Sequence, residues 1–327
     1  MTSDPLPPEL LSGPRAPGIV RPAWWSYPGS VRAETAAPLD ALLRTARPRQ
    51  WLKNVLVFAA PGAAGVLADG KVIARATAAF VLFSLAAAGT YFLNDAADQA
   101  SDRVHPVKRL RPVAAGLVPV RLARVVGGVL IAVSLLLAVP VDPHLAFVLA
   151  VYVVVTLSYI GFLKEQPVLD MAAVASGFVI RAIAGGIAGG VPLSNWFLIV
   201  ASFGSLFMVA GKRHAELLDV DEDHRASHRS TLAVYSLGYL RYVRSIASGV
   251  TITAYCFWAF EKAHLAGHAS IWFELSIVPF VLCILRYALL LDAGRGGAPE
   301  DVVLEDRALL AIGLVWVAFF ALGVYAR

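Results

Sequence analysis

The sequence has few charged residues and almost no cysteine. Only 16% of its 327 residues are Asp, Glu, Lys or Arg, whereas 58% are hydrophobic, and the mean hydropathy is +0.68. A soluble domain of this length would be hard to keep in solution with that composition. The two cysteines, Cys256 and Cys283, lie in apolar segments and offer neither a disulfide framework nor a metal-ligand spacing. The sequence therefore predicts an integral membrane protein.

The apolar segments also lack the every-second-residue alternation of a membrane β-barrel. They are continuous runs of roughly 17–25 residues, the length that a helix needs to cross a bilayer. We therefore expect an all-α bundle with nine transmembrane helices. The predicted spans are 54–69, 72–93, 118–140, 145–163, 168–189, 194–211, 236–260, 271–291 and 308–326.

No long apolar run is present before Leu39. The segment is rich in Pro, Gly and Ser, which is typical of neither a secretory signal nor a span. We expect residues 1–38 to form a disordered cytoplasmic tail and residues 39–327 to form one transmembrane domain.

Basic residues are scarce in every second loop. If the N-terminus is cytoplasmic, Lys and Arg concentrate on the inner side, as the positive-inside rule requires. The two long polar loops, 94–117 and 212–235, then both face the cytoplasm. This distribution predicts a multi-pass membrane protein with a cytoplasmic N-terminus. We expect it to lie in the plasma membrane, with the lipid bilayer as a partner and no nucleic acid.

Acidic residues cluster where the second predicted span ends. Asn94, Asp98 and Asp102 follow one another in steps of four and share a helix face, with Asp95 in the same arc. Oxygen ligands of this kind suit Mg²⁺, which shares its remaining positions with water and substrate phosphates. The pattern predicts a site for Mg²⁺ and a diphosphate. An ordinary solvated helix end is the alternative, and the spacing alone does not decide between them.

Basic residues accompany these acids on both long loops. Lys108, Arg109 and Arg111 follow them directly, and we expect them to contact phosphate, although topology signals are the alternative. On the second loop, Lys212 and Arg213 lie one helical turn from Glu216, from where they could address a polyanion.

Isolated polar residues lie in or near other spans. Lys164 and Asp170 flank a short turn, and a salt bridge between them is expected. Arg181 lies deep in a span, so it should point into a water-filled cavity or to a partner. Lys53 and Asn54 belong to an interfacial belt by default, with contact to a lipid phosphate as the alternative.

Several strings together resemble the UbiA superfamily of intramembrane prenyltransferases. The similar segments are RPRQWLKNVLVFAAP, YFLNDAADQASDRVHPVKRLRPVAAG, SGFVIRAIAGG and LFMVAGKRHAEL. The resemblance extends from about Arg47 to the C-terminus. Within the family, these segments resemble the branch that attaches phosphoribose to decaprenyl phosphate. The resemblance implies a UbiA-type bundle with a cavity that faces the cytoplasm.

Two departures from the wider family favour a phosphosugar donor. Many family members have a second aspartate-rich motif after the sixth span, where this sequence reads GKRHAE. They also have a Tyr-x-x-x-Lys element, with the lysine four residues after the tyrosine, whereas here Lys164 follows Tyr159 by five residues. The resemblance then implies transfer from 5-phosphoribosyl 1-diphosphate to a polyprenyl phosphate, with Mg²⁺ held by Asn94, Asp95, Asp98 and Asp102. The expected substrate contacts are Lys53, Asn54, Lys108, Arg109, Arg111, Tyr159, Lys164, Asp170, Arg181, Lys212, Arg213 and Glu216.

Two other functions stay open from the sequence. One is an aromatic prenyltransferase that uses a prenyl diphosphate, and the other is a transporter whose path includes Arg181 and the acidic loop. Acids and bases on two long loops of one side favour chemistry over transport. The sequence leaves a homo-oligomer open.

Overall fold

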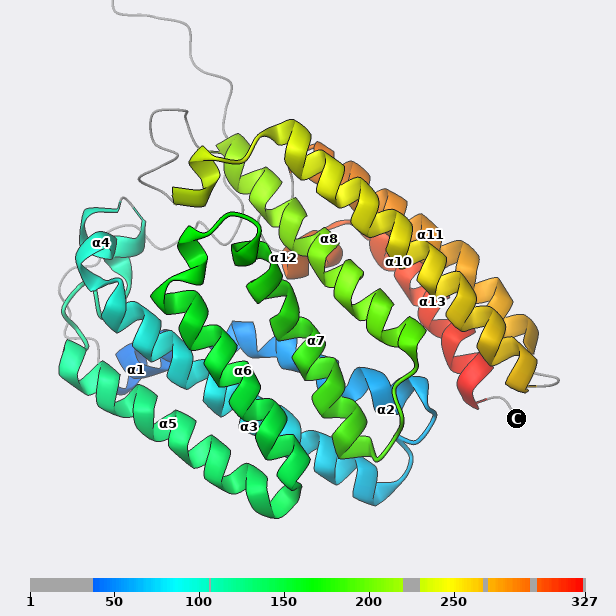
Figure 1. The fold of residues 1–327 in the computed structure, drawn as a ribbon, viewed down its shortest axis with the longest axis horizontal. Coiled ribbons are helices and arrows are strands. Elements are labelled where there is room, and N and C mark those ends of the chain that lie inside the picture. The colour runs from blue at the N-terminus through cyan, green and yellow to red at the C-terminus, as the bar shows by residue number, and fades with distance from the viewer. Residues whose placement is uncertain (1–37, 106, 220–229, 267–269, 295–298, 326–327) are drawn as a thin grey trace, which may run out of the picture. The chain divides into compact units, whose positions relative to one another are not determined.

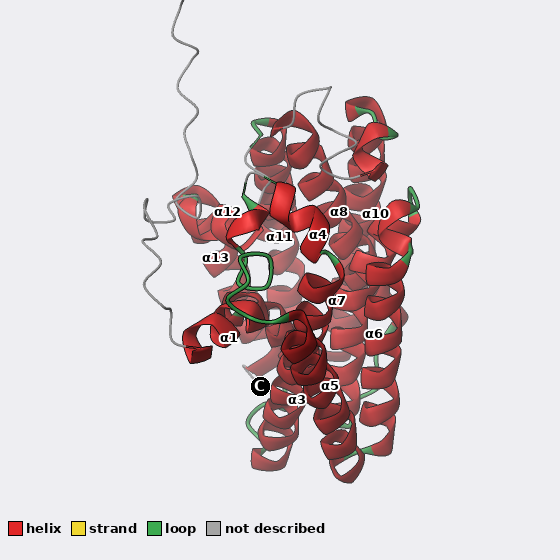
Figure 2. Cartoon of the chain, turned by 90° about the vertical axis from the view of Figure 1, so that its left-hand side faces the viewer, coloured by secondary structure: helices red, strands yellow, loops and turns green. Residues whose placement is uncertain are grey.

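The described part of the chain is built from helices alone. The computed structural model describes residues 38–105, 107–219, 230–266, 270–294 and 299–325. Within these ranges the loops and turns connect helices, and no strand occurs (Figure 2). The tail predicted for residues 1–38 lies outside the described residues, except for Pro38, which begins the first helix.

Seven helices are long and apolar enough to cross a membrane. They are α3 (Gly70–Ala97), α5 (Val120–Val141), α6 (Pro143–Gly161), α7 (Leu169–Gly189), α8 (Asn195–Asp219), α11 (Ser270–Asp292) and α13 (Arg307–Tyr325). An eighth helix, α10 (Leu237–Ala266), is long enough with its 30 residues. It is not among the seven because its composition is more polar. The multi-pass membrane prediction is thus confirmed for the described chain, but the count of nine is not.

The first predicted span, 54–69, is not one helix. Helix α1 (Pro38–Ala46) leads into the 3₁₀-helix η3 (Pro48–Phe58) and the five-residue helix α2 (Ala59–Ala63). A 3₁₀-helix rises about 2 Å per residue and an α-helix about 1.5 Å, so η3 and α2 laid end to end reach about 30 Å. In line with each other, these 11 and 5 residues would match the thickness of a bilayer core with fewer residues than an α-helix needs.

The long helices alternate in direction, and each packs on the next one along the chain (Figure 1). Helices α3, α6, α8 and α11 therefore finish at the same end of the bundle, where α5, α7, α10 and α13 begin. We call this the polar end. It also holds five short elements: α4 (Gln99–Val104), η4 (Lys108–Leu110), η5 (Leu163–Glu165), η7 (Ser230–Ala233) and α12 (Pro299–Glu305).

Glycines let backbones approach closely at two crossings. Gly89 of α3 and Gly127 of α5 face each other, and a Cβ on either would lie 2.8–2.9 Å from the carbonyl oxygen of the other. A Cβ on Gly185 of α7 would lie 2.1 Å from the carbonyl oxygen of Val57 in η3. Small residues at such contacts are the usual means of tight helix association in membranes. The Gly185 contact fixes η3 against α7.

Replacing Gly185 with alanine should therefore destabilise the protein. The new methyl group meets backbone atoms of η3, which cannot rotate away, and overpacking of this kind costs about 1–3 kcal/mol. Thermal unfolding of the purified protein in detergent measures the effect. Gly128→Ala on α5 is the matched control, since a Cβ there meets nothing within 4 Å. Equal melting temperatures for the two variants would contradict the close contact between η3 and α7.

Candidate active site

Helix α3 ends in the acidic segment that the spacing singled out. The helix stops at Ala97, Asp98 lies at the break, and α4 starts at Gln99. The helical hydrogen bonds continue across the break, with Asp98 N 2.9 Å from Asn94 O and Asp102 N 2.8 Å from Asp98 O. The helix therefore continues past the predicted span to Val104, with one interruption at Asp98.

The three carboxylates of this segment, Asp95, Asp98 and Asp102, form what we call the acid cluster. The side chains of Asp95 and Asp102 are buried, with 2% and 4% exposure, whereas that of Asp98 is 24% exposed. Asp98 is thus the carboxylate that an incoming ligand reaches most easily. Asn94 lies on the same helix end and is half-buried.

Basic side chains from three elements pair with the acid cluster. Arg111 Nη1 lies 2.7 Å from Asp102 Oδ2 and 3.5 Å from Asp95 Oδ1. Lys164 Nζ lies 2.7 Å from Asp98 Oδ1. Arg47 also pairs with Asp95. Three carboxylates thus face three cations, so their charges balance without a ligand.

The acid cluster fits Mg²⁺ by the chemistry of its donors. Within the described ranges, no three acidic, histidine or cysteine side chains gather into a ready-made metal cage. Magnesium rarely needs one, because one or two carboxylates, water and substrate phosphates complete its shell. Lys164 contacts one carboxylate oxygen of Asp98, and Arg111 contacts one of Asp102. The second oxygen of each carboxylate can then bind a metal. Asn94 and Asp95 adjoin them.

A second polar group lies between α6, α7 and α8, and we call it the Arg213 cluster. The guanidinium of Arg213 is 3% exposed, with Nε 3.0 Å from Asp170 Oδ2 and Nη1 2.9 Å from Glu216 Oε2. Its Nη2 lies 3.4 Å from the hydroxyl of Tyr159. Arg213 is therefore buried in an ion-pair network instead of lining a wall that faces solvent. Its neighbour Lys212 is 44% exposed, with Nζ 4.0 Å from Glu216 Oε1.

The predicted salt bridge between Lys164 and Asp170 is wrong. Lys164 reaches α3 to pair with Asp98, and Asp170, which is fully buried, pairs with Arg213 of α8. The reason is the turn between α6 and α7, which sends the side chains that precede and follow it towards different helices. This turn consequently joins the acid cluster to the Arg213 cluster.

Arg181 has neutral partners. Its Nε lies 2.6 Å from Asn54 Oδ1, its Nη1 2.6 Å from the carbonyl oxygen of Gly177, and its Nη2 3.1 Å from the hydroxyl of Tyr152. Asn54 is fully buried and also donates to Ser84 Oγ at 2.9 Å. Arg181 and Asn54 therefore tie η3 to α7, and the described structure places neither in an open substrate cavity.

Three further basic residues from the sequence analysis lie away from these pairs. Lys108 is half-buried and Arg109 exposed, both on η4 in the loop that leads to Arg111. The amine of Lys53 donates to the side chain of Gln50. Within the described chain, Arg47, Arg111 and Lys164 make the ion pairs of the acid cluster.

Several residues of these networks escaped the sequence analysis. Arg47 was not among the expected site residues, yet it pairs with Asp95 and lies over the ring of Tyr91, 4.8 Å from its centroid. Tyr152 and Tyr235 carried no signal, because a lone tyrosine in or beside a span is usual at a membrane interface. Tyr235 donates to Asp170 Oδ1 at 2.5 Å.

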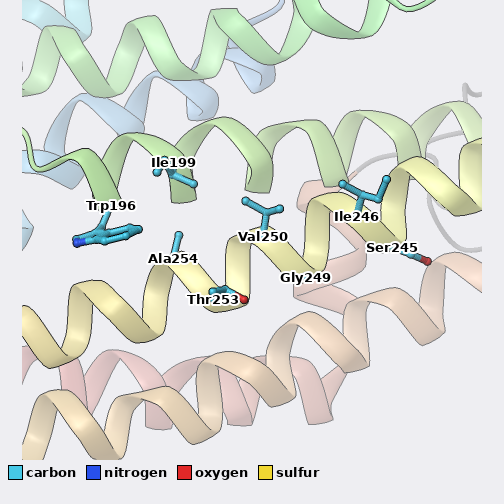
Figure 3. Close-up of a pocket in the computed structure, with 8 residues that line it drawn as sticks. All are labelled: Trp196, Ile199, Ser245, Ile246, Gly249, Val250, Thr253 and Ala254. Carbon is cyan, nitrogen blue, oxygen red and sulfur yellow. The ribbon is translucent and has the colours of Figure 1, made fainter.

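Two apolar grooves lie beside α8. The first, of ≈ 480 Å³, lies between α8 and α10, with Trp196 and Ile199 on one side and Gly249, Val250 and Ala254 on the other (Figure 3). The second, of ≈ 330 Å³, lies between α7 and α8 and extends from Ala172, two residues after Asp170, to Ile180. Neither groove is lined by the acid cluster. Both offer room for hydrocarbon, and the second begins near Asp170 of the Arg213 cluster.

Known proteins share this sequence and fold. The model of the UbiA prenyltransferase family matches residues 55–311. The chain is 47% identical over 281 residues to decaprenyl-phosphate phosphoribosyltransferase of Mycobacterium tuberculosis, covering 85% of this chain and 92% of that one. It is 44% identical over 305 residues to the protein of the same name from Mycolicibacterium smegmatis, covering 89% and 96%.

A solved structure shares the same architecture. A UbiA homolog from Archaeoglobus fulgidus bound to GPP and Mg²⁺ superposes with a TM-score of 0.65 at 17% identity, covering 88% of this chain and 100% of that one. At this identity the likeness shows the fold. The family match covers most of the sequence and two relatives are similar over nearly their full lengths, so the chain belongs to the UbiA prenyltransferase family.

Proposed function

We propose that the protein transfers the 5-phosphoribosyl group of 5-phosphoribosyl 1-diphosphate to decaprenyl phosphate or a related polyprenyl phosphate. In the reaction the bond from C1 of the ribose to the diphosphate breaks, a bond from C1 to a phosphate oxygen of the lipid forms, and pyrophosphate leaves. The observation that carries the proposal is the charge-balanced acid cluster, whose cations come from three different elements. The names of the relatives at 44% and 47% identity support the same activity.

The acid cluster would hold Mg²⁺ on the diphosphate of the sugar, through Asp98 and Asp102 with Asn94 and Asp95 beside them. When bound, the ion neutralises the negative charge that grows on the departing pyrophosphate. The 24% exposure of Asp98 provides the approach, and the burial of Asp95 and Asp102 keeps the inner part of the cluster in place.

The basic residues around the cluster would bind the phosphates. Arg111 and Lys164 already lie within 2.7 Å of carboxylate oxygens, so a phosphate that arrives at the cluster meets both cations. Lys108 and Arg109 precede Arg111 on the same loop and suit the separate 5-phosphate of the sugar. Lys53 and Lys212 could contribute further positive charge at the edge of the site.

The lipid phosphate needs no general base, because it is already ionised at neutral pH. The protein's part is therefore to bring the phosphate oxygen and C1 together in the right orientation, which lowers the entropic barrier. The apolar groove between α7 and α8 starts beside Asp170 and would take part of the polyprenyl chain. Residues 39–327 would thus form one catalytic unit, with the polar end facing the cytoplasm in the plasma membrane.

A transfer assay with purified protein in lipid nanodiscs tests the proposal. The assay supplies labelled 5-phosphoribosyl 1-diphosphate, Mg²⁺ and polyprenyl phosphates of several lengths, and the expected result is a labelled lipid together with free pyrophosphate. Removing divalent ions with a chelator should stop lipid labelling, and added Mg²⁺ should restore it.

The same preparation separates the two rival functions. If a prenyl diphosphate and an aromatic acid react while the lipid phosphate stays unlabelled, the protein is an aromatic prenyltransferase instead. If label crosses the membrane of sealed vesicles with no new covalent product, it is a transporter.

A further inference from the structure

The turn between α6 and α7 contains a strained residue. Val168, the residue before the first turn of α7, has φ 70° and ψ −49°. A β-branched residue with positive φ is a genuine outlier, because its side chain crowds the backbone. Such strain persists only where the surroundings hold it in place.

The Val168 side chain does not hold this shape. It is 51% exposed, so packing contributes little there, and valine provides no side-chain cap for the start of α7. Within the described chain, the contact that fixes the residue is made by its backbone. The amide N–H of Val168 donates to the hydroxyl of Tyr235 at 2.6 Å.

The same hydroxyl also anchors α7. Tyr235 is 6% exposed and donates to Asp170 Oδ1 at 2.5 Å. Burial raises the pKa of this phenol, and the hydrogen bond to Asp170 raises it further, so the hydroxyl stays protonated and can donate. It thus accepts from Val168 and donates to Asp170, which both lie at the start of α7, from a segment 65 to 67 residues away in the chain.

What this turn presents is Lys164. The 3₁₀-helix η5 carries Lys164 four residues before Val168, and its amine reaches Asp98 of the acid cluster at 2.7 Å. The conformation of the turn therefore sets how far Lys164 extends towards the carboxylate that is most exposed to ligand.

We propose that Tyr235 is a positioning residue, whose hydroxyl holds the strained turn at Val168 so that Lys164 lies at the acid cluster. The expected loss of activity rests on the proposed function. The hold of the hydroxyl on the turn rests on the geometry alone. Tyr235 itself need not touch substrate.

The test is a double-mutant cycle with a matched control. Tyr235→Phe removes the hydroxyl, and kcat/KM for 5-phosphoribosyl 1-diphosphate should fall about 10- to 100-fold, the range for a lost buried hydrogen-bond partner. Tyr239→Phe makes the same chemical change on the ring stacked 5.7 Å away, and that hydroxyl has no hydrogen bond within the described chain. This control should behave like the unchanged protein.

The variant Val168→Gly distinguishes a positioning role of the Tyr235 hydroxyl from direct contact with substrate. Glycine adopts positive φ without strain, so the turn no longer needs the hydroxyl to keep its shape. Tyr235→Phe in the Val168→Gly background should therefore lose much less activity than Tyr235→Phe alone. A hydroxyl that contacts substrate could not be replaced in this way, and an undiminished loss in the double variant would overturn the proposal.

Hydrogen exchange of the peptide over residues 162–172 gives a readout that does not depend on catalysis. Tyr235→Phe should speed exchange there, whereas Tyr239→Phe should not. Equal exchange in the two variants would show that the hydroxyl does not hold the turn. If the unchanged protein labels no lipid while exchange follows the expected pattern, the proposed function fails but the positioning of the turn stands.

Discussion

Replacing Asp98 with asparagine should lower kcat/KM for phosphoribosyl transfer by roughly 100- to 1000-fold, the usual effect of removing one group that stabilises charge in a transition state. Asparagine has nearly the same shape and can still accept a hydrogen bond from Lys164. It lacks the negative charge that a divalent ion requires. Because the Asp98 side chain is 24% exposed, the fold should tolerate the change.

Activity as a function of Mg²⁺ concentration measures this effect and identifies its cause. The loss of a metal ligand should lower the maximal transfer rate and should also raise the Mg²⁺ concentration needed for half-maximal transfer. Asp40→Asn is the matched control, since Asp40 is an exposed carboxylate that pairs with Arg44 on α1. Near-normal transfer by Asp98→Asn at limiting Mg²⁺ would remove the acid cluster from the proposed chemistry.

Replacing Arg213 with methionine should destabilise the whole protein. The change removes the cation that lies 3.0 Å from Oδ2 of the fully buried Asp170 and 2.9 Å from Glu216 Oε2. Removing one partner of a buried ion pair typically costs about 3–5 kcal/mol, because the remaining charge stays desolvated. A marked drop in the unfolding temperature and in the yield of folded protein is expected, measured in detergent by thermal unfolding.

Two further variants separate this structural role from phosphate binding. Lys212→Met removes the neighbouring cation, which is 44% exposed, and should leave the unfolding temperature nearly unchanged. Combining Arg213→Met with Asp170→Asn also removes the buried negative charge that faced Arg213, and should recover part of the lost stability. If Arg213→Met melts like the unchanged protein, the buried network is not what holds α7 to α8.

The acid cluster shows what local patterns can predict. Asn94, Asp98 and Asp102 follow the helical period, and the structure keeps the same turn-to-turn hydrogen bonds across the break at Asp98. The break itself could not be foreseen, because no proline or glycine marks it. The first predicted span shows what local patterns cannot predict. The segment is apolar as expected, but the chain there forms η3 and α2, and the contact of Val57 with Gly185 fixes η3 against α7.

Pairing between distant segments was out of reach for the sequence. Lys164 and Asp170 are near neighbours along the chain, and proximity favoured a salt bridge between them. Their real partners lie 66 residues away at Asp98 and 43 away at Arg213. The deep guanidinium of Arg181 likewise finds Asn54, 127 residues away. Burial obliges each charged group to find a partner, but the packing of the helices decides which partner is in reach.

The sequence by itself determined the membrane class, the family and the residues that carry the candidate chemistry, because hydropathy, helical period and long matching strings are properties of short stretches of chain. Only the tertiary structure decided that Arg111, Lys164 and Arg47 balance the acids, and that Arg213 and Arg181 serve the framework. The physical reason is that ion pairing depends on distances of a few ångströms between helix ends, and those distances exist only after the helices have packed.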